Sequence, residues 1–103
     1  MNFDPGGLIE NVYRLQIINS DEGPVELDLR ATGVPGLDLL VVDQGTVKVQ
    51  VEGSATRLVP VVLRAPVDGL KPGLYDIQFE TTGTRASGEA AAVTEPSSFY
   101  VPN

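Results

Sequence analysis

Residues 70–80, with the sequence LKPGLYDIQFE, decide the fold of this chain. After the turn residues Pro72 and Gly73, apolar and polar side chains alternate over Leu74–Thr82. The apolar side of this segment holds Tyr75, Ile77 and Phe79. A strand with one buried face has this period of two, because successive side chains point to opposite faces of a sheet. We therefore predict a β-strand here, with its apolar side facing a core.

Further strands are predicted on both sides of this segment. Strict alternation marks Val12–Asn19, Val25–Arg30 and Thr46–Glu52. Leu37–Asp43 and Leu58–Ala65 are apolar on both faces in places, which is typical of central strands or of strands covered on their outer side. A short last strand passes through Phe99 and Val101. Short strands separated by Gly, Pro and Asp, with no helical period, predict an all-β immunoglobulin-like Greek-key β-sandwich of about seven strands.

Two parts of the chain interrupt this pattern. Pro60 has no N–H to donate to a ladder, so we expect it at a bulge or facing an open edge. Residues Gly83–Pro96 are mostly small and polar, and we predict a long mobile loop there. A poorly formed strand through Ala91–Thr94 is the alternative.

Tyr75 follows the Pro72-Gly73 turn at the start of a strand. In Greek-key sandwiches a tyrosine at such a place can fold back, so that its hydroxyl bonds a backbone group a few residues upstream. We predict this tyrosine corner, with Tyr75, Pro72 and Gly73 as structural residues. The alternative is an ordinary inward aromatic whose hydroxyl lies at the rim.

The length of 103 residues suits one domain, which we expect to occupy residues 8–103 after an N-terminal tail at 1–7. The longest apolar run, Leu39–Val42, is far shorter than the roughly 20 residues of a membrane span. Met1 is followed by neither a basic nor an apolar segment, so no signal peptide is expected. The chain is therefore expected to be cytosolic or to be cut from a longer protein.

The charge and residue types exclude several functions. Fourteen acidic and seven basic residues give a net charge of −7, and nucleic acid is a poor partner for such a surface. The chain has no Cys and no His, and these residues supply most nucleophiles, general bases and soft-metal ligands. We therefore predict no enzyme activity and no cofactor in this domain.

Paired carboxylates provide the remaining metal hypothesis. Asp21 with Glu22, or Asp38 with Asp43, offer oxygen ligands for Ca²⁺ near turns. Acidic pairs in turns more commonly cap and solvate the backbone. A calcium site is thus the less favoured interpretation.

Residues 7–19, GLIENVYRLQIIN, resemble the opening of the C-terminal domain of the FixG/CcoG/RdxA family. Further similar segments follow in the same order, at residues 33–37, 59–61, 64–66 and 95–99. The resemblance implies an immunoglobulin-like domain that follows the transmembrane helices and iron–sulfur part of a membrane-bound parent, on the periplasmic face of the inner membrane. Proteins of this family are described as accessory factors for assembly of the cbb-type cytochrome c oxidase.

The redox work of that family, proposed to be copper reduction, depends on cysteines that this chain lacks, so no catalytic or cluster-binding residue is carried over. Chain upstream of Gly7 in the parent is expected to add an edge strand. Without it, the exposed edge invites pairing with a second copy, as a homodimer.

We therefore expect a non-catalytic interaction or scaffold domain whose partners are oxidase subunits or assembly factors. The alternative is a generic extracytoplasmic adhesion or carbohydrate-binding module on the same fold. Sugar-binding surfaces commonly present exposed aromatics, and Tyr100 is the residue most suited to that place. Tyr100 and Pro60 are the candidate docking residues.

Overall fold

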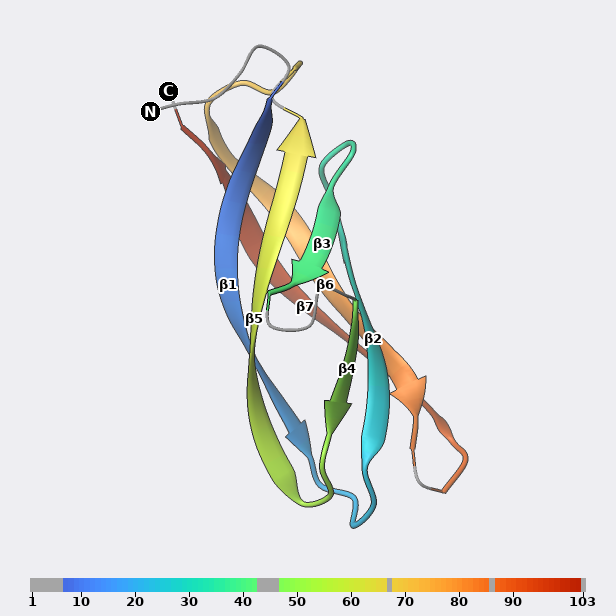
Figure 1. The fold of residues 1–103 in the computed structure, drawn as a ribbon. Helices are drawn as coiled ribbons and strands as arrows, with labels where there is room; N and C mark the ends of the chain where they lie inside the picture. Colours follow the sequence, from blue (N-terminus) through green and yellow to red (C-terminus); the bar gives the residue numbers. More distant parts are fainter. Residues whose placement is uncertain (1–6, 43–46, 67, 86, 103) are drawn as a thin grey trace.

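The computed structural model describes residues 7–42, 47–66, 68–85 and 87–102, which form a sandwich of two antiparallel sheets (Figure 1). One sheet has the order β1-β5-β3 and the other the order β4-β2-β6-β7. The strands are β1 (Leu8–Asn19), β2 (Val25–Thr32), β3 (Asp38–Val41), β4 (Lys48–Val51), β5 (Ala55–Pro66), β6 (Gly73–Thr84) and β7 (Ala90–Val101). The predicted immunoglobulin-like β-sandwich is confirmed.

The core lies between the two sheets and is built from the apolar side of each alternating strand. Val25, Leu27 and Leu29 of β2 are buried, while Glu26 and Asp28 between them are exposed. The largest side chains that are fully buried are Phe99, Leu63, Ile77, Val41, Val49, Val51, Val59 and Val61. Removal of such apolar surface from water is the main force that holds the sheets together.

The two segments that are apolar on both faces differ in their positions. β5 is central, since it pairs with β1 on one side and with β3 on the other. β3 pairs only with β5 among the described residues and is an edge strand. The central-strand interpretation is therefore correct for β5 and wrong for β3.

Pro60 limits the length of β3. The backbone N–H of Val42 donates to the Pro60 carbonyl at 3.0 Å, so the main-chain groups of Pro60 face β3. Pro60 cannot return a hydrogen bond because it has no N–H. The ladder between β3 and β5 accordingly ends one position earlier, at the pair Val41 and Val61. Pro60 thus lies one residue beyond the last pair of the ladder between β3 and β5.

The predicted loop at 83–96 is wrong over most of its length, whereas the strand considered through Ala91–Thr94 is present as part of a longer one. β6 continues to Thr84 and β7 begins at Ala90, and the two pair continuously from Gly73–Val101 to Thr84–Ala90. The alanines and threonines there have little packing value of their own, but β6 offers them a complete ladder. This pairing overrides the weak local preference, because β-propensity depends on context.

Several strand ends also differ from the predicted ones. β1 begins at Leu8 and β5 at Ala55, because these two strands pair along their whole length, from Leu8–Pro66 to Asn19–Ala55. The end of the predicted strand at Asp43, the start of the next one at Thr46 and residues 1–6 of the predicted tail lie outside the described residues.

Candidate interaction surface

The predicted hydrogen bond from Tyr75 is present. Its hydroxyl donates to the Lys71 carbonyl at 2.7 Å and accepts from the Lys71 backbone N–H at 2.9 Å. Pro72 and Gly73 lie in the tight connection between them, and Gly73 has a φ of +143°, which a residue with a side chain rarely adopts. The hydroxyl thereby ties the start of β6 to the chain that leads into it.

Replacing Tyr75 with phenylalanine is expected to lower the free energy of unfolding by about 1 kcal/mol, the net value of a typical hydrogen bond. Urea denaturation monitored by circular dichroism would measure the change. Tyr100→Phe is the matched control, because no hydrogen bond of the Tyr100 hydroxyl is found among the described residues. Equal midpoints for the Tyr75 variant and the unaltered protein would contradict a stabilising role of the corner.

The two predicted docking residues lie on opposite outer faces of the sandwich. Tyr100 is 52% exposed and points away from the core, because its neighbours Phe99 and Val101 point inward. Pro60 is half-buried and lies between the buried Val59 and Val61, so it faces outward from the other sheet. The structure therefore does not bring Tyr100 and Pro60 together into one surface.

The edge strands β1 and β7 are joined by side chains. The Asn11 side-chain amide donates to the Tyr100 carbonyl at 3.0 Å, and its carbonyl oxygen accepts from the Tyr100 N–H at 2.9 Å. The Tyr13 hydroxyl donates to the Ser98 carbonyl at 2.7 Å. Sequence reasoning missed Asn11, although one signal was present: this polar residue is in phase with the inward side chains Tyr13 and Leu15.

Burial raises the pKa of the Tyr13 phenol above its ordinary value. Just above about pH 10, tyrosine at position 13 ionises in the unfolded chain but stays protonated in the folded one. Its contribution to stability is fully present below the unfolded pKa and is lost as pH rises through the folded pKa. We expect the thermal midpoint of the protein to fall more steeply between about pH 9 and about pH 11 than that of Tyr13→Phe. Parallel pH profiles would contradict this assignment.

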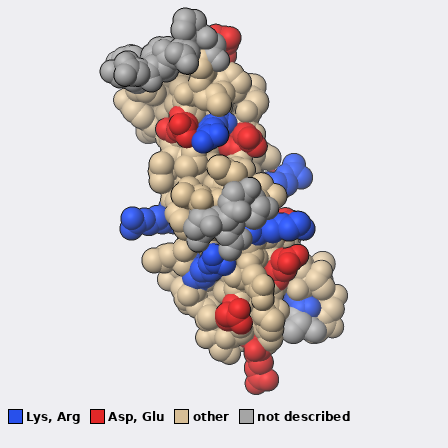
Figure 2. Space-filling model, in the orientation of Figure 1, with Lys and Arg blue, Asp and Glu red and all other residues tan. Residues whose placement is uncertain are grey.

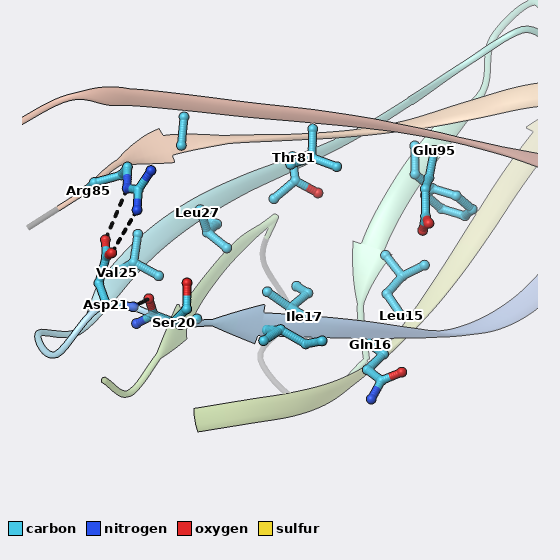
Figure 3. Close-up of a pocket in the computed structure, with 15 residues that line it drawn as sticks. Leu15, Gln16, Ile17, Ser20, Asp21, Val25, Leu27, Thr81, Arg85 and Glu95 are labelled. Carbon is cyan, nitrogen blue, oxygen red and sulfur yellow. Dashed lines mark hydrogen bonds and ion pairs between the residues drawn. The ribbon is translucent and has the colours of Figure 1, made fainter. Parts of the chain in front are cut away.

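Beyond these contacts the edges of β1 and β7 enclose a cleft of about 390 Å³ between the sheets (Figure 3). Figure 3 shows Leu15 and Ile17 of β1 on one side of it, with Leu27 and Thr81 of the other sheet opposite. At one end the Arg85 guanidinium donates to both carboxylate oxygens of Asp21, at 2.8 and 3.2 Å. This hydrogen bonding raises the pKa of Arg85 above its ordinary value.

The acidic pairs considered for calcium do not form a ligand cluster in the described part of the chain. Among those residues no group of three or more acidic, His or Cys side chains is placed to hold a metal ion. Asp21 is bound to Arg85, and the Asp38 carboxylate accepts from the Leu39 N–H at 3.1 Å. Asp43 lies outside the described residues.

Charged side chains of both signs are interspersed on the face formed by β1, β5 and β3 (Figure 2). One ion pair on this face joins Arg64 to Glu10 at 3.0 Å, and a pair on the other sheet joins Lys48 to Asp28 at 3.3 Å. Their side chains are largely exposed, so each pair contributes little to stability. No helix in the described ranges is long and apolar enough to cross a membrane.

Comparisons with known proteins agree with this architecture. Residues 3–102 match the model of a family described as "IG-like fold at C-terminal of FixG, putative oxidoreductase". The crystal structure of a FixG-related protein from Vibrio parahaemolyticus is 25% identical, with a TM-score of 0.66, and the match covers 85% of this chain and 76% of that one.

A second solved structure shares the fold alone. It is an extracellular fragment of EsaA from Streptococcus gallolyticus, 16% identical with a TM-score of 0.57, and the match covers 97% of this chain and 26% of that one. No curated protein matches the sequence. The family match spans nearly the whole chain, and the chain therefore belongs to the family of immunoglobulin-like domains found at the C-terminus of FixG.

Proposed function

We propose that this domain is a non-catalytic interaction or scaffold domain of a membrane-bound iron–sulfur protein that assists assembly of the cbb-type cytochrome c oxidase. In this proposal the domain lies on the periplasmic face of the inner membrane. Copper delivery or reduction takes place elsewhere in the parent chain, which also holds the iron–sulfur clusters. The partners are oxidase subunits or assembly factors. Membership of the FixG C-terminal family supports this role.

The observation that carries the proposal is the number of large apolar side chains that the folded domain leaves in solvent. On the outer face of the β1-β5-β3 sheet, Val12 is 72% exposed, Ile18 69% and Leu58 62%. Val12 lies opposite Val62 and Ile18 opposite Thr56, so these side chains share one face of the paired strands. Several large exposed apolar side chains on one face of a small folded domain favour a site that binds another protein.

The residue types also favour binding over chemistry. The sequence contains neither His nor Cys, the residues that supply most general bases, nucleophiles and soft-metal ligands. The domain would then act by binding a partner protein through a surface complementary to it.

A pull-down of the full-length parent protein, with and without this domain, tests the proposal. We expect oxidase subunits in the material captured by the intact parent and their loss when the domain is deleted. The absorption spectrum of the parent's clusters serves as the control, because it should not change if the rest of the protein is intact. Capture of the same oxidase subunits by the parent protein without the domain would overturn the docking role.

A further inference from the structure

The open edge of β7 has two parts: one near Ser98 and Tyr100, to which side chains of β1 form hydrogen bonds, and one from Ala90 to Glu95. Because Tyr100 bonds Asn11 through both its N–H and its carbonyl, its main-chain groups point away from β6. In an antiparallel ladder every second residue does the same. The main-chain groups of Ala90, Ala92 and Thr94 therefore also face away from β6, and within the described ranges no strand lies beyond β7.

Side chains of β1 form hydrogen bonds with the edge only at the C-terminal part of β7. Asn11 and Tyr13 bond the edge at Tyr100 and Ser98. Pro96, the next residue with this orientation, has no N–H, so only its carbonyl faces the open edge. The remaining part, from Ala90 to Glu95, spans roughly 20 Å at about 3.3 Å per residue. It thus has the length of a short strand.

The space on the core-facing side of residues 90–95 is not filled by side chains and forms part of the cleft. Val93 is in phase with the buried Phe99 and Val101, yet it is 61% exposed. It lines the cleft together with Leu15 and Ile17 of β1, which are only half-buried. An additional strand along β7 would place alternate side chains between these residues and would remove their apolar surface from water.

Charge restricts what this strand can be. Glu95 is exposed and lines the cleft, and no partner for its carboxylate is found among the described residues. The opposite end of the cleft is neutralised by the ion pair of Asp21 and Arg85. A second copy of this chain would bring another net charge of −7 and another Glu95 to the edge. A strand with a basic side chain fits better.

We propose that residues 90–95 of β7 bind an extended segment of a partner protein by strand addition, with apolar side chains at alternate positions and a Lys or Arg that meets Glu95. Main-chain hydrogen bonds to Ala90, Ala92 and Thr94 would supply binding, and the cleft would select the alternate side chains. This inference rests on the proposed docking role and deepens it: it places a docking site at the edge of β7, apart from the exposed apolar residues of the β1-β5-β3 face, and it names the chemistry of the partner.

Three blocked eight-residue peptides provide the probes. Each has valine at three alternate positions and threonine between them, and the fourth alternate position is lysine, threonine or glutamate. NMR titration of the labelled domain and amide hydrogen exchange would locate binding. We expect slower exchange at Ala90, Ala92 and Thr94, and the tightest binding for the lysine peptide. In Glu95→Gln the three peptides should bind alike.

Two variants block the site in different ways. Ala92→Pro removes an N–H that faces the open edge, and Val93→Asp places a charge at an exposed apolar position, so both should fold. Each is expected to weaken binding of the lysine peptide by about tenfold or more. Leu74→Asp is the matched control, because Leu74 is 72% exposed on the outer side of β6 and does not line the cleft. Unchanged thermal midpoints verify that the variants are folded.

Several results would overturn the inference. These are no binding of any peptide, full binding to Ala92→Pro, or chemical-shift changes that centre on Val12 and Leu58. A dimer that Ala92→Pro converts to a monomer in sedimentation would assign the edge to a second copy instead. If deletion of the domain from the parent abolishes capture of oxidase subunits but Ala92→Pro does not, the docking role stands and this site fails.

Discussion

Replacing Phe99 with alanine is expected to lower the free energy of unfolding by about 3–5 kcal/mol, which is a large part of the stability of a domain of this size. Phe99 has no exposed surface and leads the fully buried side chains in size. It extends from β7 into the space between the sheets, with Tyr75 opposite it on β6. The variant loses the transfer free energy of the ring and leaves a cavity that the sheets can fill only in part.

Equilibrium denaturation in urea would measure this loss, with near-ultraviolet dichroism to report side-chain packing. Tyr100→Ala is the matched control, because it removes an aromatic ring from the next residue, which is 52% exposed. The control should cost less than about 1 kcal/mol. A loss for Phe99→Ala no greater than for the control would mean that β7 is not packed as described.

Replacing Asn19 with aspartate is expected to cost about 3 kcal/mol, although the two side chains have nearly the same shape. Asn19 is a buried polar residue, and its side-chain amide donates to the carbonyls of Gly23, Val51 and Glu52 at 2.9–3.2 Å. It thereby joins the end of β1 to the end of β4 and to the turn before β2. A carboxylate has no hydrogen to donate and would place its charge against three carbonyl oxygens.

The pH dependence separates this explanation from general disruption. In the variant, burial and the nearby carbonyls favour the protonated acid, so the pKa of the new carboxyl group should lie above its usual value. The loss of stability should therefore be greatest near neutral pH and smaller at about pH 4, where the group can donate one hydrogen bond. Asn11→Asp is the control, because its hydrogen bonds are exposed to solvent. Equal losses at positions 11 and 19 would contradict the role of Asn19.

The sequence by itself determined the fold class, and it did so through local alternation. The period of two in Val25–Arg30 and Leu74–Thr82 identifies which side chains are buried, because a one-residue shift would expose all of them. The same local reasoning placed Tyr75 close enough to the Pro72-Gly73 turn to bond the backbone beside it. The family resemblance also required only the order of short motifs along the chain, and the family match confirms it.

Only the tertiary structure decided the features that depend on residues far apart in the chain. β7 forms because β6 offers a ladder to residues 90–96, whose own side chains predict at most a poorly formed strand through Ala91–Thr94. Asn11 meets Tyr100, and Asn19 meets Val51, across separations that no local pattern records. The cleft arises where the edges of β1 and β7 separate. Periodicity reports which face of a strand is apolar, but the neighbours of an edge are fixed by how the two sheets are stacked.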